Sequence, residues 1–126
     1  VVEQYDIIID GTDNYPSRFL INDICVELNK PYIYGSVADY EGQVSVFNFN
    51  GGPNYRDLYP ELSDNELNSN IQIGVLGVLT GLIGCIQAAE AIKMITGLGT
   101  TLSGKLLIVN TLTMEFKKFN IKKDKG

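Results

Sequence analysis

Residues 10–14, which read Asp-Gly-Thr-Asp-Asn, are the polar cluster in this sequence best placed to do chemistry. They follow the isoleucines 7–9, a β-branched run typical of a strand buried on both faces in a parallel sheet. Open α/β sheets bind ligands beyond the carboxyl ends of their strands. Asp13 is therefore a candidate ligand for the Mg²⁺ of a nucleoside triphosphate, because magnesium favours carboxylates together with phosphates. The local pattern leaves open a second role, in which Asp13 or Asn14 only caps the following helix.

Other catalytic chemistry is restricted by composition. The sequence has no histidine, which excludes Ser/His/Asp triads, Cys/His pairs and histidine-ligated metals. Its two cysteines, Cys25 and Cys85, stand far apart in apolar surroundings, so neither a metal-binding pair nor a disulfide framework is indicated. We expect both to be buried thiols of a protein in the reducing cytoplasm.

The elements that position the cluster alternate between strands and helices. We expect strands at residues 6–10, 32–36, 43–49, 105–109 and 114–122, and helices at residues 15–29 and 74–96. The first strand, helix and second strand predict a right-handed parallel unit. The last two strands predict an antiparallel hairpin, with a bulge at Lys117-Lys118 where strict alternation fails. The sequence therefore predicts an α/β fold.

The helix expected at residues 74–96 carries small residues at regular spacing, which predicts one face thin enough for close approach to a sheet or a second helix. Residues 73–89 are uncharged and contain Gly77-x-x-x-Gly81, a pattern found in membrane helices. The segment is slightly short for a span, and Glu90 and Lys93 continue the same helix. We therefore expect a buried helix and no membrane partner.

Residues 53–72 show little periodicity and form a connection longer than usual, so they are the first place to look for a ligand cover. Tyr55, Arg56, Leu58 and Tyr59 within it are either an anchoring patch for a partner or a means of fastening the loop. The sequence has 126 residues and a net charge of −5, and half of its ten basic residues stand in the last ten positions. Such an acidic body should repel nucleic acids and anionic membranes. We expect the chain to be a piece of a longer protein.

Taken together, several segments resemble one known family. They are residues 6–14 with Arg18 and Asn22, then Glu41-Gly-Gln-Val-Ser-Val46, Gly74-Val-Leu-Gly77, the helical stretch 84–93 and Gly97. In unbroken order they look like the carboxyl-terminal half of the ThiF/MoeB/HesA adenylyltransferases, bacterial relatives of the ubiquitin-activating (E1) enzymes. The resemblance implies that residues 1–126 form half of a larger, Rossmann-like three-layer domain.

The resemblance also implies an activity. Such enzymes bind ATP and Mg²⁺ and adenylate the carboxyl-terminal glycine of a ubiquitin-like sulfur carrier, in thiamine or molybdopterin synthesis, releasing pyrophosphate. The family's motif assigns nucleotide and metal contacts to Asp13 and nucleotide contacts to Asn14. Residues 54–72 would lie over the carrier's tail, and relatives are commonly cytoplasmic homodimers.

Three departures from the family bear on function. Where most members carry zinc-binding cysteines, this chain reads Asn54-Tyr-Arg-Asp57, so structural zinc is predicted to be absent. Asn70 replaces a cysteine used by many members, so a covalent step there is not available. The family's phosphate loop belongs to the half that precedes this sequence, and the isolated chain is therefore predicted to be inactive. The alternative is a non-catalytic E1-like module that only binds a partner.

Overall fold

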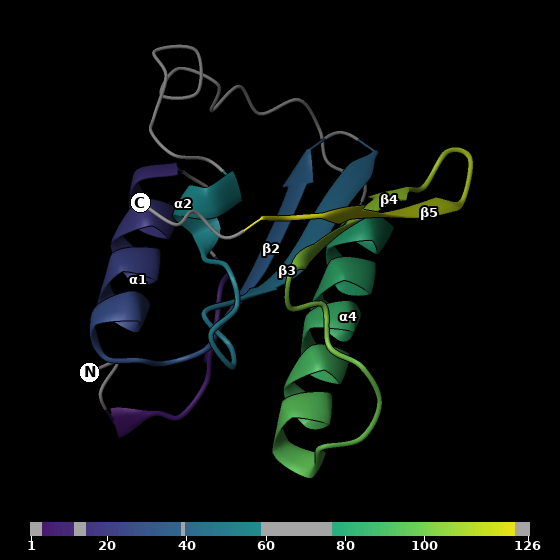
Figure 1. The fold of residues 1–126 in the computed structure, drawn as a ribbon. Coiled ribbons are helices and arrows are strands. Elements are labelled where there is room, and N and C mark those ends of the chain that lie inside the picture. The colour runs from purple at the N-terminus through teal and green to yellow at the C-terminus, as the bar shows by residue number, and fades with distance from the viewer. Residues whose placement is uncertain (1–3, 12–14, 39, 59–76, 123–126) are drawn as a thin grey trace.

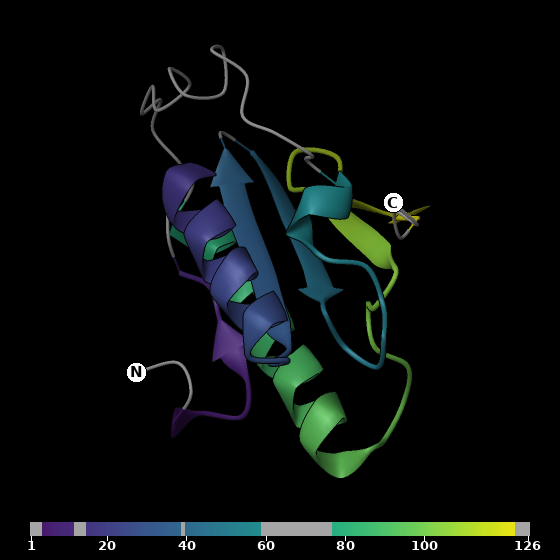
Figure 2. The ribbon, with the colours of Figure 1, turned by 60° about the vertical axis from the view of Figure 1, so that its left-hand side comes forward.

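A mixed sheet forms the middle layer of the molecule. The structure is a computed structural model that describes residues 4–11, 15–38, 40–58 and 77–122. The five strands lie in sequence order and are β1 (Ile8–Ile9), β2 (Tyr32–Ala38), β3 (Glu41–Phe47), β4 (Lys105–Asn110) and β5 (Glu115–Asn120). Helix α1 (Tyr15–Glu27) and the short α2 (Tyr55–Leu58) lie on one face, and α4 (Gly77–Thr96) lies on the other (Figure 1 and Figure 2). The predicted three-layer α/β arrangement is confirmed.

The strand pairing is parallel only at one end of the sheet. β1 pairs parallel with β2 through the α1 crossover, and β4 pairs antiparallel with β5, both as predicted. The pairs β2 with β3 and β3 with β4 are antiparallel, which the sequence patterns did not indicate. Only residues 39 and 40 separate β2 from β3, too few for the crossover that a parallel pair needs.

The expectation that the first strand is buried on both faces is wrong for this chain. β1 comprises two residues at the edge of the sheet and pairs only with β2. The side chain of Ile9 is 50% exposed. Ile7 and Ile8 are partly buried against the two hydrophobic cores, so Ile9 alone of this run is exposed.

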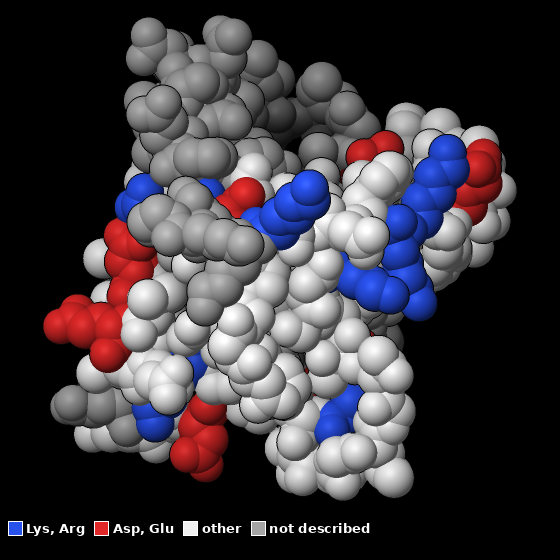
Figure 3. All heavy atoms as spheres, viewed as in Figure 1, with Lys and Arg blue, Asp and Glu red and all other residues white. Residues whose placement is uncertain are grey.

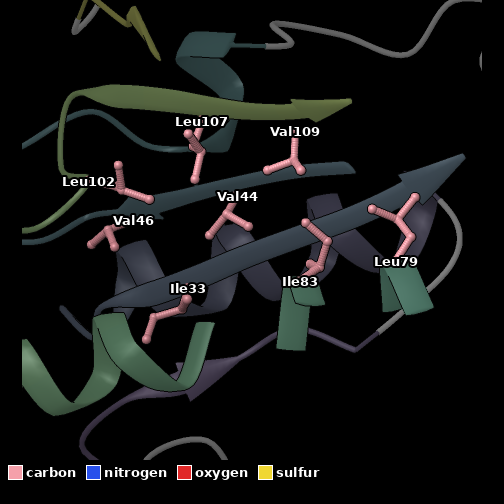
Figure 4. Packing of buried hydrophobic residues seen from close by; sticks show 8 residues of the cluster. All are labelled: Ile33, Val44, Val46, Leu79, Ile83, Leu102, Leu107 and Val109. Atoms are coloured by element: carbon pink, nitrogen blue, oxygen red, sulfur yellow. The ribbon is translucent and has the colours of Figure 1, made fainter. Parts of the chain in front are cut away.

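One hydrophobic core lies between the sheet and α4 (Figure 4). Leu79 and Ile83 point from α4 towards Val44 and its neighbours on β3 and β4. Gly42 permits this approach, because a Cβ at that position would lie 2.5 Å from the Ile83 side chain. The contact face of α4 is thus formed by its large apolar residues.

The opposite face of α4 is exposed, and three expectations about this helix are wrong for this chain. A Cβ added to Gly77, Gly81 or Gly84 would meet nothing within 4 Å, so these glycines do not face the sheet. Cys85 is exposed on the same helix instead of buried. The helix as a whole was expected to be buried, yet only 22% of the most apolar 18-residue window of α4, with a mean hydropathy of 1.5, is buried. Within the described residues α4 alone passes the length and composition test for a membrane span, which core helices of soluble proteins also pass.

The second core, between the sheet and α1 with α2, is rich in aromatic rings. Phe19 and Tyr55 pack with their ring centroids 4.9 Å apart, and Tyr55 lies 5.1 Å from Tyr34. Phe47 completes the cluster from β3. Cys25 of α1 is buried among these side chains, as predicted. This layer covers the sheet next to the end of β1.

The hairpin of β4 and β5 is regular. Its pairing runs without a break from Lys105 opposite Asn120 to Asn110 opposite Glu115, so the predicted bulge is absent and that expectation is wrong. The side chain of Asn110 accepts hydrogen bonds from the turn amides, and Met114 takes up the left-handed conformation. Every residue of β5 is exposed, and basic side chains gather over the hairpin (Figure 3).

Candidate functional site

The carboxyl end of β1 lies where the sequence places the polar cluster. The Asp10 amide continues the parallel ladder by donating to the Ile33 carbonyl at 2.9 Å. The Asp10 side chain then turns inward and is fully buried. Its Oδ2 atom accepts a hydrogen bond from the Tyr32 hydroxyl. Burial and the Asp10 carboxylate raise the pKa of Tyr32 well above its usual value, which keeps this hydroxyl protonated as a donor.

Arg18 approaches the same carboxylate from α1. Its Nε atom lies 3.9 Å from Asp10 Oδ2, and its guanidinium lies 5.7 Å from the centroid of the Tyr34 ring. Burial of the guanidinium lowers the pKa of Arg18, but its electrostatic interactions with Tyr34, Tyr55 and Asp10 together raise the pKa above its usual value. Arg18 therefore remains a cation in the protein interior, and Asp10 provides a nearby opposite charge.

Gln87 reaches the same point from α4, on the other side of the sheet. Its Nε2 atom donates to the carbonyl of Asp10 at 2.9 Å and to that of Ile33 at 3.3 Å. The Gln87 amide lies over Gly35, where a Cβ would approach it within 2.5 Å. Gln87 thus holds the main chain at the end of β1 from the α4 side of the sheet. Tyr32 and Arg18 contact the Asp10 side chain on the opposite side.

The predicted site residues Asp13 and Asn14 lie outside the described residues. The choice between a metal ligand and a helix cap therefore stays a prediction. The structure does assign a role to the other carboxylate of the cluster, because Asp10 is buried and engaged by Tyr32 and Arg18. The donor chemistry of the segment still fits a magnesium ion, with Asp13 as its remaining carboxylate.

Sequence reasoning placed Asp10 in this region but gave it no role of its own, and it missed Tyr32 and Gln87. A signal was present for Gln87, since it recurs at helical spacing with the buried Leu79 and Ile83 yet is polar. A polar residue on a buried helical face needs a hydrogen-bond partner, which here is the end of β1. No local signal distinguished Asp10 from Asp13, because burial depends on which strand pairs with β1.

The positions aligned with the family's zinc-binding cysteines cap helix α2 in this chain. Asn54 Oδ1 accepts from the Arg56 amide at 2.8 Å, and Asp57 Oδ2 accepts from the Asn54 amide at 2.8 Å. These reciprocal hydrogen bonds form a capping box. Asn22 of α1 ties the box to the body by accepting from the Tyr55 amide at 2.8 Å. In the part of the chain that the structure describes, no three Cys, Asp or Glu side chains gather as a metal site.

Tyr55 and Arg56 were predicted either to bind a partner or to fasten the loop to the body of the protein. In the structure they fasten the loop. Tyr55 is fully buried in the aromatic core. Arg56 makes two hydrogen bonds to Asp23 of α1, at 2.7 and 2.8 Å, and stacks 4.7 Å from the centroid of the Phe19 ring. Tyr59 and the remainder of the predicted cover, through residue 72, lie outside the described residues.

Several basic residues of the body are already engaged by the chain's own groups. Arg18 lies beside Asp10, and Arg56 is bound to Asp23. Lys93 pairs with Glu90 and also donates to the Thr100 carbonyl at 2.7 Å. These three cations are paired with acidic side chains of the same chain, so they are less available to neutralise the charge of a bound triphosphate.

Comparison with known proteins gives the family. A family model described as the ThiF family matches residues 1–126. The chain belongs to the ThiF family. It is 51% identical over 123 residues to a probable molybdopterin-synthase adenylyltransferase from Pyropia yezoensis, covering 96% of this chain and 32% of the relative. It is 45% identical over 127 residues to the probable adenylyltransferase/sulfurtransferase MoeZ of Mycobacterium tuberculosis. That match covers 97% of this chain and 32% of the relative.

The fold of this ThiF family chain is also found in solved structures. The crystal structure of Escherichia coli MccB with AMPCPP and MccA superposes with a TM-score of 0.80 at 16% identity. That match covers 95% of this chain and 38% of the MccB chain. The chain thus spans about a third of the length of the relatives it matches.

Proposed function

We propose that this chain is part of an enzyme that uses ATP to adenylate the carboxyl-terminal glycine of a ubiquitin-like sulfur-carrier protein. The reaction releases pyrophosphate and serves sulfur transfer of the thiamine or molybdopterin type. The observation that carries the proposal is the Asp-Gly-Thr-Asp-Asn segment at the end of β1, in a chain half identical to a probable adenylyltransferase. Ligands of α/β sheets bind at that end of the strands.

The proposed roles within the segment differ between its two carboxylates. Asp13 would hold Mg²⁺, with Asn14 contacting the nucleotide, and the metal ion would neutralise charge where the carrier's carboxylate meets the α-phosphate. Asp10 is proposed to act only on the fold, because its buried carboxylate is engaged by Tyr32 and Arg18. This division explains why one short segment contains two aspartates.

The carrier is proposed to present an extended tail ending in glycine. The predicted cover at residues 54–72 would lie over that tail, in a channel too narrow for residues larger than glycine. The capping box and the pair between Arg56 and Asp23 support this part of the proposal, since they fix the beginning of the cover against α1. No zinc ion takes part in the proposed reaction.

The proposed reaction involves no covalent cysteine step. Burial and the Asp10 charge raise the pKa of Cys25 to about 11, which makes its thiol a poor nucleophile near neutral pH. Asn70 occupies the position at which many family members carry a cysteine. The acyl adenylate itself would therefore be the species passed to sulfur transfer.

The assembly is proposed to be a cytoplasmic homodimer, and activity is proposed to require the part of the parent protein that precedes this chain. Exposed apolar residues on α4 and on the hairpin support an apolar interface. They include Val78, Ile92 and Ile95 on the helix and Leu112, Met114, Phe116 and Phe119 on the hairpin.

Exchange of labelled pyrophosphate into ATP tests the proposal, using the full-length protein and a candidate carrier. We expect Asp13→Asn to lower the exchange rate by about 100-fold or more, since one preorganised charge at a reacting centre is worth that much. Asp6→Asn is the matched control, because Asp6 lies at the amino end of the same strand and is exposed. Unchanged exchange in Asp13→Asn would remove the metal role. Carrier binding without any exchange in the wild type would favour the non-catalytic module.

A further inference from the structure

The end of β1 is held by side chains from both outer layers, and the proposed function does not account for them. We infer that Gln87, together with Tyr32, is a positioning residue that fixes the main chain at Asp10 and thereby the point from which the chain proceeds to Asp13. This inference rests on the proposed function, and it assigns a role in that function to a helix outside the motif.

The first argument is the cost of placing Gln87 where it lies. The residue is 7% exposed on a helical face that otherwise packs Leu79 and Ile83 into the core. A buried amide destabilises the fold unless it is hydrogen bonded. Gln87 satisfies this need at a single place, the adjacent carbonyls of Asp10 and Ile33 on two neighbouring strands. Those two carbonyls lie where β1 ends.

The second argument is the hold on the Asp10 side chain. Asp13 stands between Asp10 and Arg18 in the sequence, and these two flanking residues lie beside each other with Arg18 Nε 3.9 Å from Asp10 Oδ2. The Tyr32 hydroxyl donates to the same Oδ2 atom. The two flanks of the motif therefore lie close together, and the first flank is attached to the sheet through Tyr32.

Loss of this positioning should raise the Mg²⁺ concentration that the full-length protein needs for pyrophosphate exchange. Groups that orient a metal ligand without touching the metal typically change metal affinity by about 10- to 100-fold when they are removed. Gln87→Met keeps the length and burial of the side chain but cannot donate. In the full-length protein we expect it to raise the Mg²⁺ concentration for half-maximal pyrophosphate exchange by about 10-fold, with the maximal rate largely restored at saturating Mg²⁺.

Glu90→Met is the matched control on the same helix. Glu90 is also buried and polar, but it accepts from the Leu102 amide at 2.6 Å in the segment after α4, away from β1. Both methionine variants should lower the thermal unfolding temperature. Only Gln87→Met should change the Mg²⁺ requirement.

Tyr32→Phe provides a second variant that acts on Asp10 from the other face and keeps the ring packed against Phe47. A raised Mg²⁺ requirement in this variant supports the inference even if Gln87→Met does not fold. The inference is overturned if folded Gln87→Met or Tyr32→Phe shows the wild-type Mg²⁺ requirement, or if Glu90→Met shows the same shift. Absence of exchange in the wild type would instead overturn the proposed function.

Discussion

The thiol of Cys25 illustrates how burial controls chemistry at the scale of one residue. Its pKa is raised to about 11, first by burial and then by the nearby Asp10 charge. Because the thiolate is the reactive form and Cys25 is fully buried, we expect Cys25 to resist alkylation at pH 7. Mass-spectrometric mapping of iodoacetamide adducts measures this.

Cys85 is the internal control in that experiment when the chain is labelled by itself, because its side chain is exposed on α4. It should be modified at neutral pH while Cys25 is not. Equal labelling of both cysteines in the folded chain would contradict the buried position of Cys25.

Single residues were predictable where their role depends on sequence neighbours. The expected end of the long helix at residue 96 is confirmed, and Gly97, with φ of 72°, follows it directly. The burial of Asp10 and the exposure of Cys85 could not be predicted, because each depends on which element packs against the residue. Asp13 and Asn14 remain predictions from the motif and the resemblance.

At the scale of elements, the pair between Arg56 and Asp23 attaches α2 to α1. The hydrogen bond from Arg56, with its charge, lowers the pKa of Asp23 below the usual 3.8. A lowered pKa means that the pair stabilises the fold above that usual value and that this contribution is lost as the pH falls through the lower, folded value. Because both side chains are about half exposed, the contribution should be about 0.2–1 kcal/mol.

Asp23→Asn tests this attachment. We expect faster amide hydrogen exchange at Arg56 and Asp57 than in the wild type above about pH 5, and a difference that disappears in strong acid as Asp23 protonates. Glu115→Gln is the matched control, since it removes a second exposed ion pair, with Lys117, on the hairpin. If Glu115→Gln speeds exchange in α2 equally, the effect is one of net charge.

The long elements followed from periodicity, whereas their packing did not. Helices α1 and α4 and the final hairpin were predicted close to their observed bounds. The parallel pair was also predicted, but β1 comprises only Ile8–Ile9 instead of residues 6–10, and the short α2 was not predicted. The glycines of α4 were expected to face a neighbour, yet Gly77, Gly81 and Gly84 face open space and the large apolar residues pack against the sheet. The small residues and the large apolar residues of α4 both recur at helical spacing. Spacing alone therefore does not show which of the two helix faces packs against the sheet.

At the scale of the whole molecule, the chain contains the proposed magnesium ligand, but three of the five basic residues outside its lysine-rich last ten positions are engaged within the fold. Arg18, Arg56 and Lys93 are engaged within the fold, and the chain covers 32% of its relative from Pyropia yezoensis. We therefore expect residues 1–126 alone to give no pyrophosphate exchange under conditions in which the full-length protein gives a clear signal. Exchange by the isolated, monomeric chain would show that its own residues suffice to hold the triphosphate.

The close approach of α4 to β2 makes positions 35 and 87 interdependent. Glycine at 35 leaves the space that the Gln87 amide fills, and alanine there would collide with it at 2.5 Å. A larger residue at position 35 would therefore displace the Gln87 amide, which would lose its hydrogen bonds to the two carbonyls. Gly35 thus belongs to the same structural unit as Gln87, although it makes no hydrogen bond to it through a side chain.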